Sequence, residues 1–495
     1  MITAESGDLI LLQADGISFD EPASRLVATG NGVVTFRGSH LYFTDLVYDI
    51  RNDQLDIEKK FKIVSTPNQT IFAQKMHYNI KKKIGQVASL DARIEKAFIR
   101  GNSLTVTPNK LLIGQSVFTT CDLPSPHYKI VSKKMEIYPD MGVVASFDNL
   151  LFLQGIPLLW LPVYVYGSGS YNPLSSHFAD TSIFPRFGSN PREGSFVKGG
   201  MSYLLSPASM GSIDLGYMEK NGPYWGISHH HTPDPLHHIT GYLHSLGMEG
   251  WDGGLVYQWD FLTLPRVSSQ ADPSTLHPLN LGKFQPSQLG TGQLTFMSRF
   301  NELINYSRVD HKAQAELLFH NISVDKDRFV VETTFKVGQI GEKTFENRYI
   351  DSFCAQNETT LVSKIDVAGV ILIPETHYYG NWYSDRNWQR LMATLKMTFN
   401  TFWGNPSLAY SKRLMGSGGS PFEFDQQFAF QHDEVGYSIQ GKWGSLECQI
   451  FQNFDLETKR FRLSTISISS GIHCWKTIFS WDTLTGQVGL GASLN

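Results

Sequence analysis

Cysteine spacing bears most directly on metal chemistry in this 495-residue chain. The four cysteines are Cys121, Cys354, Cys448 and Cys474, and no two of them have the close C-x₂-C spacing that is typical of a zinc site. We therefore expect no zinc centre.

Histidines and glycine-rich stretches are the other candidates for a chemical site. His229–His231, with His237 and His238 shortly after them, could bind a metal, but such a cluster is also typical of a hydrated strand end and turn. The glycine-rich stretches at 167–171 and 416–420 lack the strand–turn–helix setting of a hydrolase nucleophile or a phosphate loop. We expect no active site, no metal and no cofactor, and we expect that the protein is not an enzyme.

Composition limits the class of protein. The chain has 42 Lys+Arg against 46 Asp+Glu, a net charge of −4, and 41% hydrophobic residues. A nucleic-acid-binding protein would carry a basic excess, and a disordered chain would be more charged and less apolar. Because single domains usually stop growing at about 250–300 residues, we expect two folded units.

The sequence predicts no membrane-spanning helix. The most apolar run, Ile156–Tyr166, is shorter than the roughly 20 residues that a helical span needs. It also contains Pro157 and Pro162, which break helices. The first ten residues lack the charged and then apolar regions of a secretory signal, so none is expected in this stretch.

The first 150 residues contain a repeated β pattern. Phe19, Tyr48, Tyr78 and Tyr138 each lie near the end of an alternating strand that runs into a turn, at separations of 29, 30 and 60 residues. A second apolar strand follows each turn. A repeat of about 30 residues with two strands predicts a solenoid-like or folded-over β-sandwich, although alternation of this kind also arises by chance in β proteins.

From about Ser170 the strands lengthen and their alternation becomes stricter. Leu255, Tyr257, Trp259 and Phe261, for example, share a face opposite more polar residues. Such strands fit a soluble sandwich or an outer-membrane barrel. Strands that continue to the end of the chain, aromatic residues near strand ends and charged polar faces favour the barrel. The 326 residues from Ser170 to Asn495 leave room for about 16–18 antiparallel strands.

Four short segments between Phe118 and Tyr164 resemble a known family. They are Phe118-Thr-Thr-Cys121-Asp, Met135-Glu-Ile-Tyr-Pro-Asp-Met-Gly-Val-Val-Ala145, Phe147-Asp-Asn149-Leu and Gly155-Ile-Pro-Leu-Leu-Trp-Leu-Pro162-Val-Tyr164. Their order and spacing are similar to those of the lipopolysaccharide (LPS) assembly family LptD, also called the organic solvent tolerance (OstA) family. The resemblance implies an all-β chain with a periplasmic OstA-like β-jellyroll over 1–165 and a transmembrane barrel over 170–495.

The resemblance also implies a function, a location and partners. It implies a translocon in the cell outer membrane that receives LPS from an LptA-type periplasmic bridge protein and inserts it into the outer leaflet. An LptE-type plug lipoprotein would sit inside the barrel. The apolar inner face of the jellyroll would line a slot for acyl chains, and its candidate residues are Ile17, Phe19, Val34, Phe36, Leu46, Tyr48, Met76, Tyr78, Leu104 and Val106.

Within this resemblance, prolines and glycines mark a junction and a lateral gate. Pro157 and Pro162 lie at the junction, and Pro185 matches a proline that weakens the first barrel strands. Gly199 and Gly200 stand where a second proline is expected, and glycine loosens a strand through entropy. The alternative is that these are ordinary turn residues.

The resemblance further implies one disulfide, between Cys121 and Cys474, which would close a very long loop. Cys354 and Cys448 have no counterpart in the family, and we expect them to be free, buried thiols.

Two other functions remain open from the sequence. One is a general outer-membrane porin with an appended periplasmic β module. The other is a soluble β-solenoid enzyme that acts on polysaccharide. Such an enzyme would carry a row of Asp or Glu along successive repeats, and the sequence contains no such row.

Overall fold

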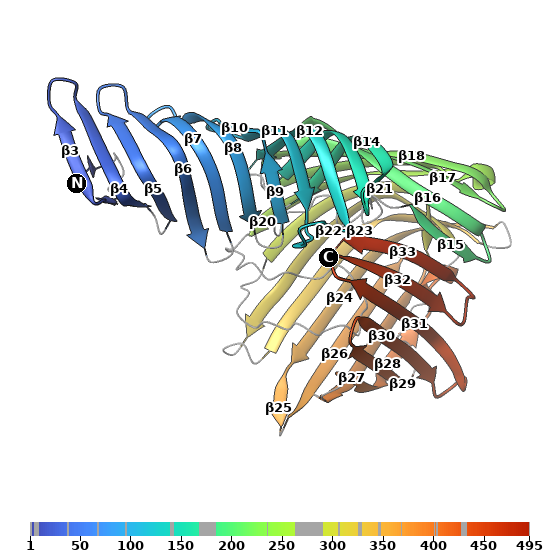
Figure 1. Cartoon of the computed structure of the whole chain (residues 1–495). Helices are drawn as coiled ribbons and strands as arrows, with labels where there is room; N and C mark the ends of the chain where they lie inside the picture. The colour runs from blue at the N-terminus through green and yellow to red at the C-terminus, as the bar shows by residue number, and fades with distance from the viewer. Residues whose placement is uncertain are drawn as a thin grey trace. The chain divides into compact units, whose positions relative to one another are not determined.

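The structure is a computed structural model of the chain, and it is almost wholly β (Figure 1). It describes residues 2–3, 9–36, 39–66, 69–94, 97–138, 143–167, 185–234, 236–262, 291–304, 307–324, 329–344, 348–367, 369–399, 401, 404–426 and 433–494. Contacts divide the chain into two compact units, which are described separately. Within the described ranges, the helices are too short and too polar to cross a membrane.

The first unit is one antiparallel sheet in which each strand pairs mainly with its neighbours in the sequence (Figure 1). Its strands are β1 (Ile2–Thr3), β2 (Leu9–Gln13), β3 (Gly16–Asp20), β4 (Arg25–Phe36), β5 (Ser39–Asp49), β6 (Gln54–Thr66), β7 (Gln69–Asn79), β8 (Ile84–Ile94), β9 (Ala97–Gly101), β10 (Ser103–Val106), β11 (Leu111–Thr119), β12 (Tyr128–Tyr138), β13 (Val143–Leu153) and β14 (Ile156–Gly167). The alternating strands and tight turns expected from the repeat are therefore confirmed.

Bulges bend the long strands of this sheet so that it folds over on itself. The register shifts within β4–β5, β5–β6 and β6–β7, and a bulge of this kind bends a strand and increases its twist. As a result, Phe43 and Phe61 beyond the bulges pack in the same buried cluster as Leu46 and Ile57. The two arms of the folded sheet thus enclose an apolar interior.

The second unit is a closed antiparallel barrel. Its strands are β15 (Arg186–Asn190), β16 (Gly194–Ser206), β17 (Ser209–Met218), β18 (Gly222–Asp234), β19 (His237–Ser245), β20 (Trp251–Leu262), β21 (Thr291–Ile304), β22 (Ser307–Val324), β23 (Phe329–Lys343), β24 (Tyr349–Ser363), β25 (Ile365–Val367), β26 (Val370–Tyr383), β27 (Asn387–Phe399), β28 (Ser407–Gly418), β29 (Glu434–Trp443), β30 (Leu446–Asp455), β31 (Arg460–Ile472), β32 (Trp475–Asp482) and β33 (Val488–Leu494). In the described part of this unit, two short helices, η2 (Gly247–Glu249) and α1 (Glu423–Gln426), lie in connections between the strands.

A proline accounts for the division between β24 and β25. Both strands pair with β26, and the pairing stops at Val362–Glu375 and resumes at Ile365–Leu372. Pro374 occupies the gap and has no amide hydrogen to donate to the ladder. Because β25 continues the line of β24, the barrel has 18 strand positions, within the predicted 16–18.

Candidate functional site: slot, barrel wall and seam

The predicted slot residues of the first unit lie on one side of the folded sheet. Leu46, Tyr48 and Met76 are buried in its apolar cluster, and Val34, Tyr78 and Leu104 pack against that cluster. Val106 is half-buried in β10, next to the same row. The side chain of Phe36 lies outside the described part of the molecule.

Ile17 and Phe19 extend the slot to its exposed end. Ile17 pairs with Ala28 and Phe19 pairs with Leu26, and residues directly opposite each other on neighbouring strands point to the same side. Because β3 lies at the end of the sheet, no further strand covers these two side chains, which are 51% and 56% exposed.

The register joins the interior residues into two rows that run across the sheet. One row passes through Phe19, Leu26, Tyr48, Leu55, Tyr78, Gly85, Val106, Leu111 and Ile137. The other contains Ile17, Ala28 and Leu46, and then Ile57, Met76, Val87, Leu104, Ile113 and Met135. The residues of both rows are apolar or aromatic. The repeat therefore builds a continuous apolar surface, against which hydrocarbon chains could be buried from water.

The barrel wall has an apolar and a polar side. On β17, Ile213, Leu215 and Tyr217 are exposed, whereas Asp214 between them is half-buried. Side chains converge and bury one another on the concave side of a closed barrel and splay apart on the convex side. The exposed apolar row therefore faces outward, as the alternation of the strands predicted.

Aromatic residues are also exposed on this outer side near strand ends. Trp225 and Trp251 meet edge to face there, with ring centroids 4.8 Å apart. Trp259, Trp382 and Trp443 are exposed near the ends of their strands as well. Interfacial positions of this kind suit aromatic rings in membrane proteins.

The inner side of the wall carries the polar groups. His238 lies 3.5 Å from the carboxylate of Asp260, which also accepts hydrogen bonds from Gln258 and Gln293. His230, from the predicted histidine cluster, bonds through its two ring nitrogens to Thr240 and Thr232. These histidines take part in the hydrogen-bonded rows of the inner wall.

Among the described residues, the seam that closes the barrel joins β15 to β33 through three register pairs. They are Phe187–Leu490, Gly188–Gly489 and Ser189–Val488. The β17–β18 pair has ten register pairs and the β23–β24 pair has fifteen. Within the described residues, the seam thus has fewer register pairs than either of these two strand pairs.

The predicted gate residues divide between the two units. Pro185 directly precedes β15, the first seam strand, and a Cβ on Gly199 of β16 would lie 3.7 Å from it. Gly200 follows on β16, where a Cβ would lie 2.5 Å from the Asp214 carboxylate. Pro157 and Pro162 lie instead in β14, the last strand of the first sheet.

Both prolines of β14 lie at irregular points of its pairing with β13. Pro157 lies next to a register shift, and Pro162 has no register partner in β13; Asp148, which lies opposite it, has a φ of 55°. These are positions where a missing amide hydrogen does least harm. Asp148 also accepts a 2.7 Å hydrogen bond from the indole of Trp160.

Three of the four cysteines are buried. Cys121 is buried, and its Sγ accepts a 3.5 Å hydrogen bond from the backbone of His127. Cys474 is buried beside the β31–β32 turn. Their disulfide would join the two units and stays a prediction. Cys354 is a buried free thiol, as expected, whereas Cys448 is a half-buried one.

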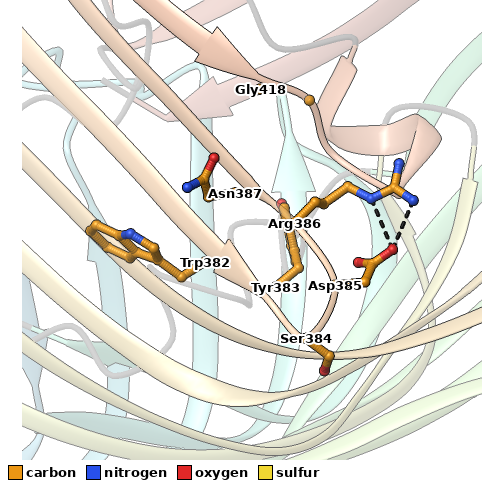
Figure 2. Close-up of a pocket in the computed structure, with 8 residues that line it drawn as sticks. Trp382, Tyr383, Ser384, Asp385, Arg386, Asn387 and Gly418 are labelled. Carbon is orange, nitrogen blue, oxygen red and sulfur yellow. Dashed lines mark hydrogen bonds and ion pairs between the residues drawn. The ribbon is translucent and has the colours of Figure 1, made fainter.

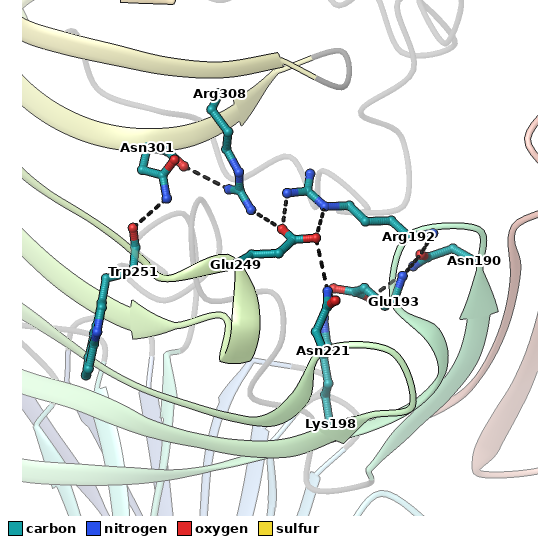
Figure 3. A network of polar contacts seen from close by, with 9 residues as sticks. All are labelled: Asn190, Arg192, Glu193, Lys198, Asn221, Glu249, Trp251, Asn301 and Arg308. Carbon is teal, nitrogen blue, oxygen red and sulfur yellow. Dashed lines mark hydrogen bonds and ion pairs between the residues drawn. The ribbon is translucent and has the colours of Figure 1, made fainter. Parts of the chain in front are cut away.

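An ion cluster that the sequence did not indicate ties together one rim of the barrel (Figure 3). We call this end rim A; β15, β17, β19, β21, β23, β26, β28, β30 and β32 end there. Glu249 of η2 accepts a 2.6 Å hydrogen bond from Nε of Arg192, in the β15–β16 turn. It also accepts hydrogen bonds from Arg308 of β22 and Asn221 of the β17–β18 turn.

The hydrogen-bond partners of Glu249 stabilise its ionised form. Burial opposes ionisation, but the two guanidinium groups of Arg192 and Arg308 more than compensate and lower the pKa of this carboxyl. The cluster thus fixes the turn of the first hairpin, which carries the seam strand β15, to two later connections.

Comparisons with known proteins assign neither a family nor an activity. No family model and no curated protein matches the chain. Among solved structures, CdiB from Acinetobacter baumannii is similar over 63% of this chain and 58% of its own, with 8% identity and a TM-score of 0.28. The translocation pore of the P pilus usher PapC matches over 95% and 94%, with 9% identity and a TM-score of 0.21. The chain thus spans little more than half the length of CdiB.

Proposed function

We propose that the chain is an outer-membrane transporter that inserts LPS into the outer leaflet through a laterally opening barrel. In this proposal the barrel spans the outer membrane, and the first unit is a periplasmic β-jellyroll that receives the lipid. The exposed apolar outer wall with aromatic residues near its strand ends supports the membrane location. The protein performs no covalent chemistry.

The short seam carries the proposal. In the described part of the seam, three register pairs join β15 to β33, with a Gly188–Gly489 pair at their centre, and such an interface separates at lower cost than a longer one. Pro185 directly precedes the first seam strand and cannot extend the ladder. A pore that conducts only along its axis has no need of such a seam, whereas a cargo that leaves sideways requires one.

The apolar interior of the first unit supports a lipid cargo. LPS carries several acyl chains and an anionic saccharide. The acyl chains need an apolar surface, and the saccharide needs a hydrated, polar path. The two apolar rows offer the first, at roughly 25 cal/mol for each Å² of hydrocarbon removed from water. The hydrogen-bonded inner wall of the barrel offers the second.

Two features of the described part of the fold offer sites for protein partners: the free edge of β3 and the lumen of the barrel. In the described part of the first sheet, β3 pairs with β4 alone, so its other edge is available to a strand of an LptA-type bridge protein. An LptE-type lipoprotein would occupy part of the lumen. Both partners are part of the proposal.

Two measurements test the proposal. The chain is expressed behind a signal peptide, and the mobility of boiled and unboiled membrane samples is compared on a gel; a folded barrel shifts. The protein is then depleted, and LPS at the cell surface is measured. We expect surface LPS to be lost and to return with the wild-type chain. Unchanged surface LPS on depletion would overturn the LPS assignment.

A general porin is the second candidate, because the inner wall is polar. A porin lets small solutes pass, and its depletion lowers their uptake without removing LPS from the surface. The same depletion experiment therefore separates the two functions.

A further inference from the structure

The connection between β28 and β29 begins by folding back onto the wall of the barrel. We call residues Gly418–Asp425 the inner segment. Its Ser420, Phe422, Phe424 and Asp425 are all buried, although they belong to a connection at rim A.

The apolar residues of the inner segment complete a small core. Phe422 and Phe424 stack with ring centroids 5.3 Å apart, and Phe422 meets the ring of Tyr383 edge to face at 5.5 Å. They share one buried cluster with residues from four further strands. These are Val309 of β22, Ile340 of β23, Cys354 of β24 and Trp388 of β27.

A polar network holds the other side of the inner segment. The Asp425 carboxylate accepts a 2.7 Å hydrogen bond from Ser420 and another from the hydroxyl of Tyr383. The side-chain amide of Asn381 lies 3.4 Å from the same carboxylate oxygen. Because Tyr383 and Asn381 belong to β26, these bonds join the segment to the wall.

Glu342 of β23 makes a second attachment. Its carboxylate is wholly buried and accepts backbone hydrogen bonds of 2.7 Å from Glu423 and 3.0 Å from Phe424. A buried carboxylate without hydrogen bonds is costly. Glu342 would lose both of these partners if the segment left the wall, unless water entered to replace them.

Glycines lie where the segment leaves β28. Gly418 has a φ of 72°, and a Cβ there would come within 1.8 Å of the backbone oxygen of Asn387 (Figure 2). The amide of Gly419 donates to that oxygen at 3.2 Å, and nothing lies within 4 Å of the Cβ position of Gly419. A single backbone hydrogen bond and open space make this a suitable hinge.

The inner segment lies on the lumenal side of the wall. Asn381 and Tyr383 belong to the buried row of β26, whereas Trp382 between them belongs to the exposed outer row. Cys354 is likewise buried beside the exposed Phe353 of β24. The cluster therefore occupies lumen space at rim A.

We propose that the inner segment is a hinged gate that narrows the lumen at rim A and opens by turning about Gly418 and Gly419. In the closed state, Phe422 and Phe424 cover Cys354, and Glu342 and Tyr383 hold the segment to the wall. In the open state, water reaches Cys354 and the lumen widens. The proposal rests on the transmembrane barrel of the proposed function and is independent of its cargo.

The gate is tested on the full chain in a bilayer, after the gel shift has shown a folded barrel. Labelling of Cys354 by a membrane-impermeant maleimide is followed by mass spectrometry of its peptide, and single-channel conductance is recorded. The test variants are Phe422→Ala/Phe424→Ala and Glu342→Gln. We expect about tenfold faster labelling in the double variant, as for a local opening equilibrium that has been shifted, with a larger conductance.

The matched control is Phe353→Ala, which removes a phenylalanine from the outer face beside the reporter thiol. It should leave labelling and conductance unchanged. If the double variant gives no folded band, the nearly isosteric Glu342→Gln carries the test in the same direction. Wild-type Cys354 that labels as fast as in unfolded protein, or folded test variants that behave as wild type, would overturn the gate. LPS transport could then still stand, because these measurements do not depend on it.

Discussion

Gly188 in the first strand of the barrel lies directly opposite Gly489 in the last. A Cβ on Gly188 would come within 2.4 Å of the Phe196 ring and 2.7 Å of the backbone oxygen of Val488. The centre of the seam therefore has no side chains that pack across it, and the close backbone approach leaves no room for them. In the described part of the seam, the pairs Phe187–Leu490 and Ser189–Val488 flank this pair.

Locking the seam should stop transport. Phe187→Cys and Leu490→Cys place two thiols on directly paired residues, where a disulfide can form under oxidising conditions. If cargo leaves between these strands, we expect surface LPS to fall on oxidation and to recover with reductant.

The control for the seam lock is Ile213→Cys with Ile227→Cys, a directly paired couple on β17 and β18 whose side chains are also exposed. This disulfide should leave surface LPS unchanged. Equal effects of the two locks would point to general damage, and normal surface LPS with a fully oxidised seam would contradict lateral exit.

Removing the charge of Glu249 should loosen rim A. In Glu249→Gln the guanidinium groups of Arg192 and Arg308 keep their charges but lose the carboxylate between them. The cluster is half-buried, so we expect a loss of about 1–3 kcal/mol, between exposed and fully buried pairs. The temperature at which the folded gel band disappears measures this loss.

Asp385→Asn at the same rim is the comparison for Glu249→Gln, because its pair with Arg386 is about half-exposed on both sides. This variant should melt as wild type. Because the pKa of Glu249 is lowered, its contribution should be present at neutral pH and should fade below its usual value of 4.5. A melting temperature of Glu249→Gln equal to wild type at pH 7 would show that the cluster does not stabilise the rim.

The exposed end of the slot should matter more for lipid than for stability. Phe19→Asp alters a side chain that is 56% exposed, so we expect a change in unfolding free energy of less than about 0.5 kcal/mol. It places a charge at the end of the apolar row, so LPS captured by a photo-cross-linker at Tyr48 should decrease. Met76→Ala in the buried cluster should instead cost about 2–4 kcal/mol. Undiminished cross-linking in Phe19→Asp would argue against entry at this end.

The inner gate should respond to pH through Asp425, which lies in a connection outside the strands. Burial raises the pKa of Asp425 to about 6, from its usual 3.8. The closed state therefore favours the neutral acid. This contribution is complete below pH 3.8 and is lost as the pH rises through about 6.

Asp425→Asn provides the reference for this pH effect, because asparagine stays neutral. The ionisable groups around Asp425 are Tyr383, Tyr379, Cys354 and Glu342. We expect the ratio of wild-type to Asp425→Asn labelling at Cys354 to rise about tenfold between pH 5 and pH 8. The ratio removes most of the pH dependence of the thiol itself, and a constant ratio would exclude Asp425 as the titrating group.

Most of the fold could be predicted from the periodicity of apolar and polar side chains. The spacing of Phe19, Tyr48 and Tyr78 predicted a repeated hairpin, and these residues lie in one row of the folded sheet. The alternation on β20 and similar strands predicted the two-sided barrel wall. Periodicity works here because every second residue of a strand must face the same medium.

The rim features could not be predicted in the same way. The ion cluster forms because turns that are distant in the sequence lie close together at the rim, bringing Glu249 to Arg192 and Arg308. No local sequence pattern predicts these contacts. Phe422 and Asp425 follow the glycine-rich stretch 416–420, where no long alternation of polar and apolar residues marks them as buried. Their burial depends on Glu342 and Tyr383, which are tens of residues away in the sequence.

The two apolar rows of the first unit have an energetic consequence for anything that moves along them. From Phe19 to Ile137, each neighbour in the row is hydrocarbon or aromatic, with Gly85 as the only member that lacks a side chain. An acyl chain that slides by one strand exchanges one such contact for another of similar strength. Under the proposed function the rows would supply neither a downhill slope nor a trap, so the direction of travel would be set by something outside these two rows.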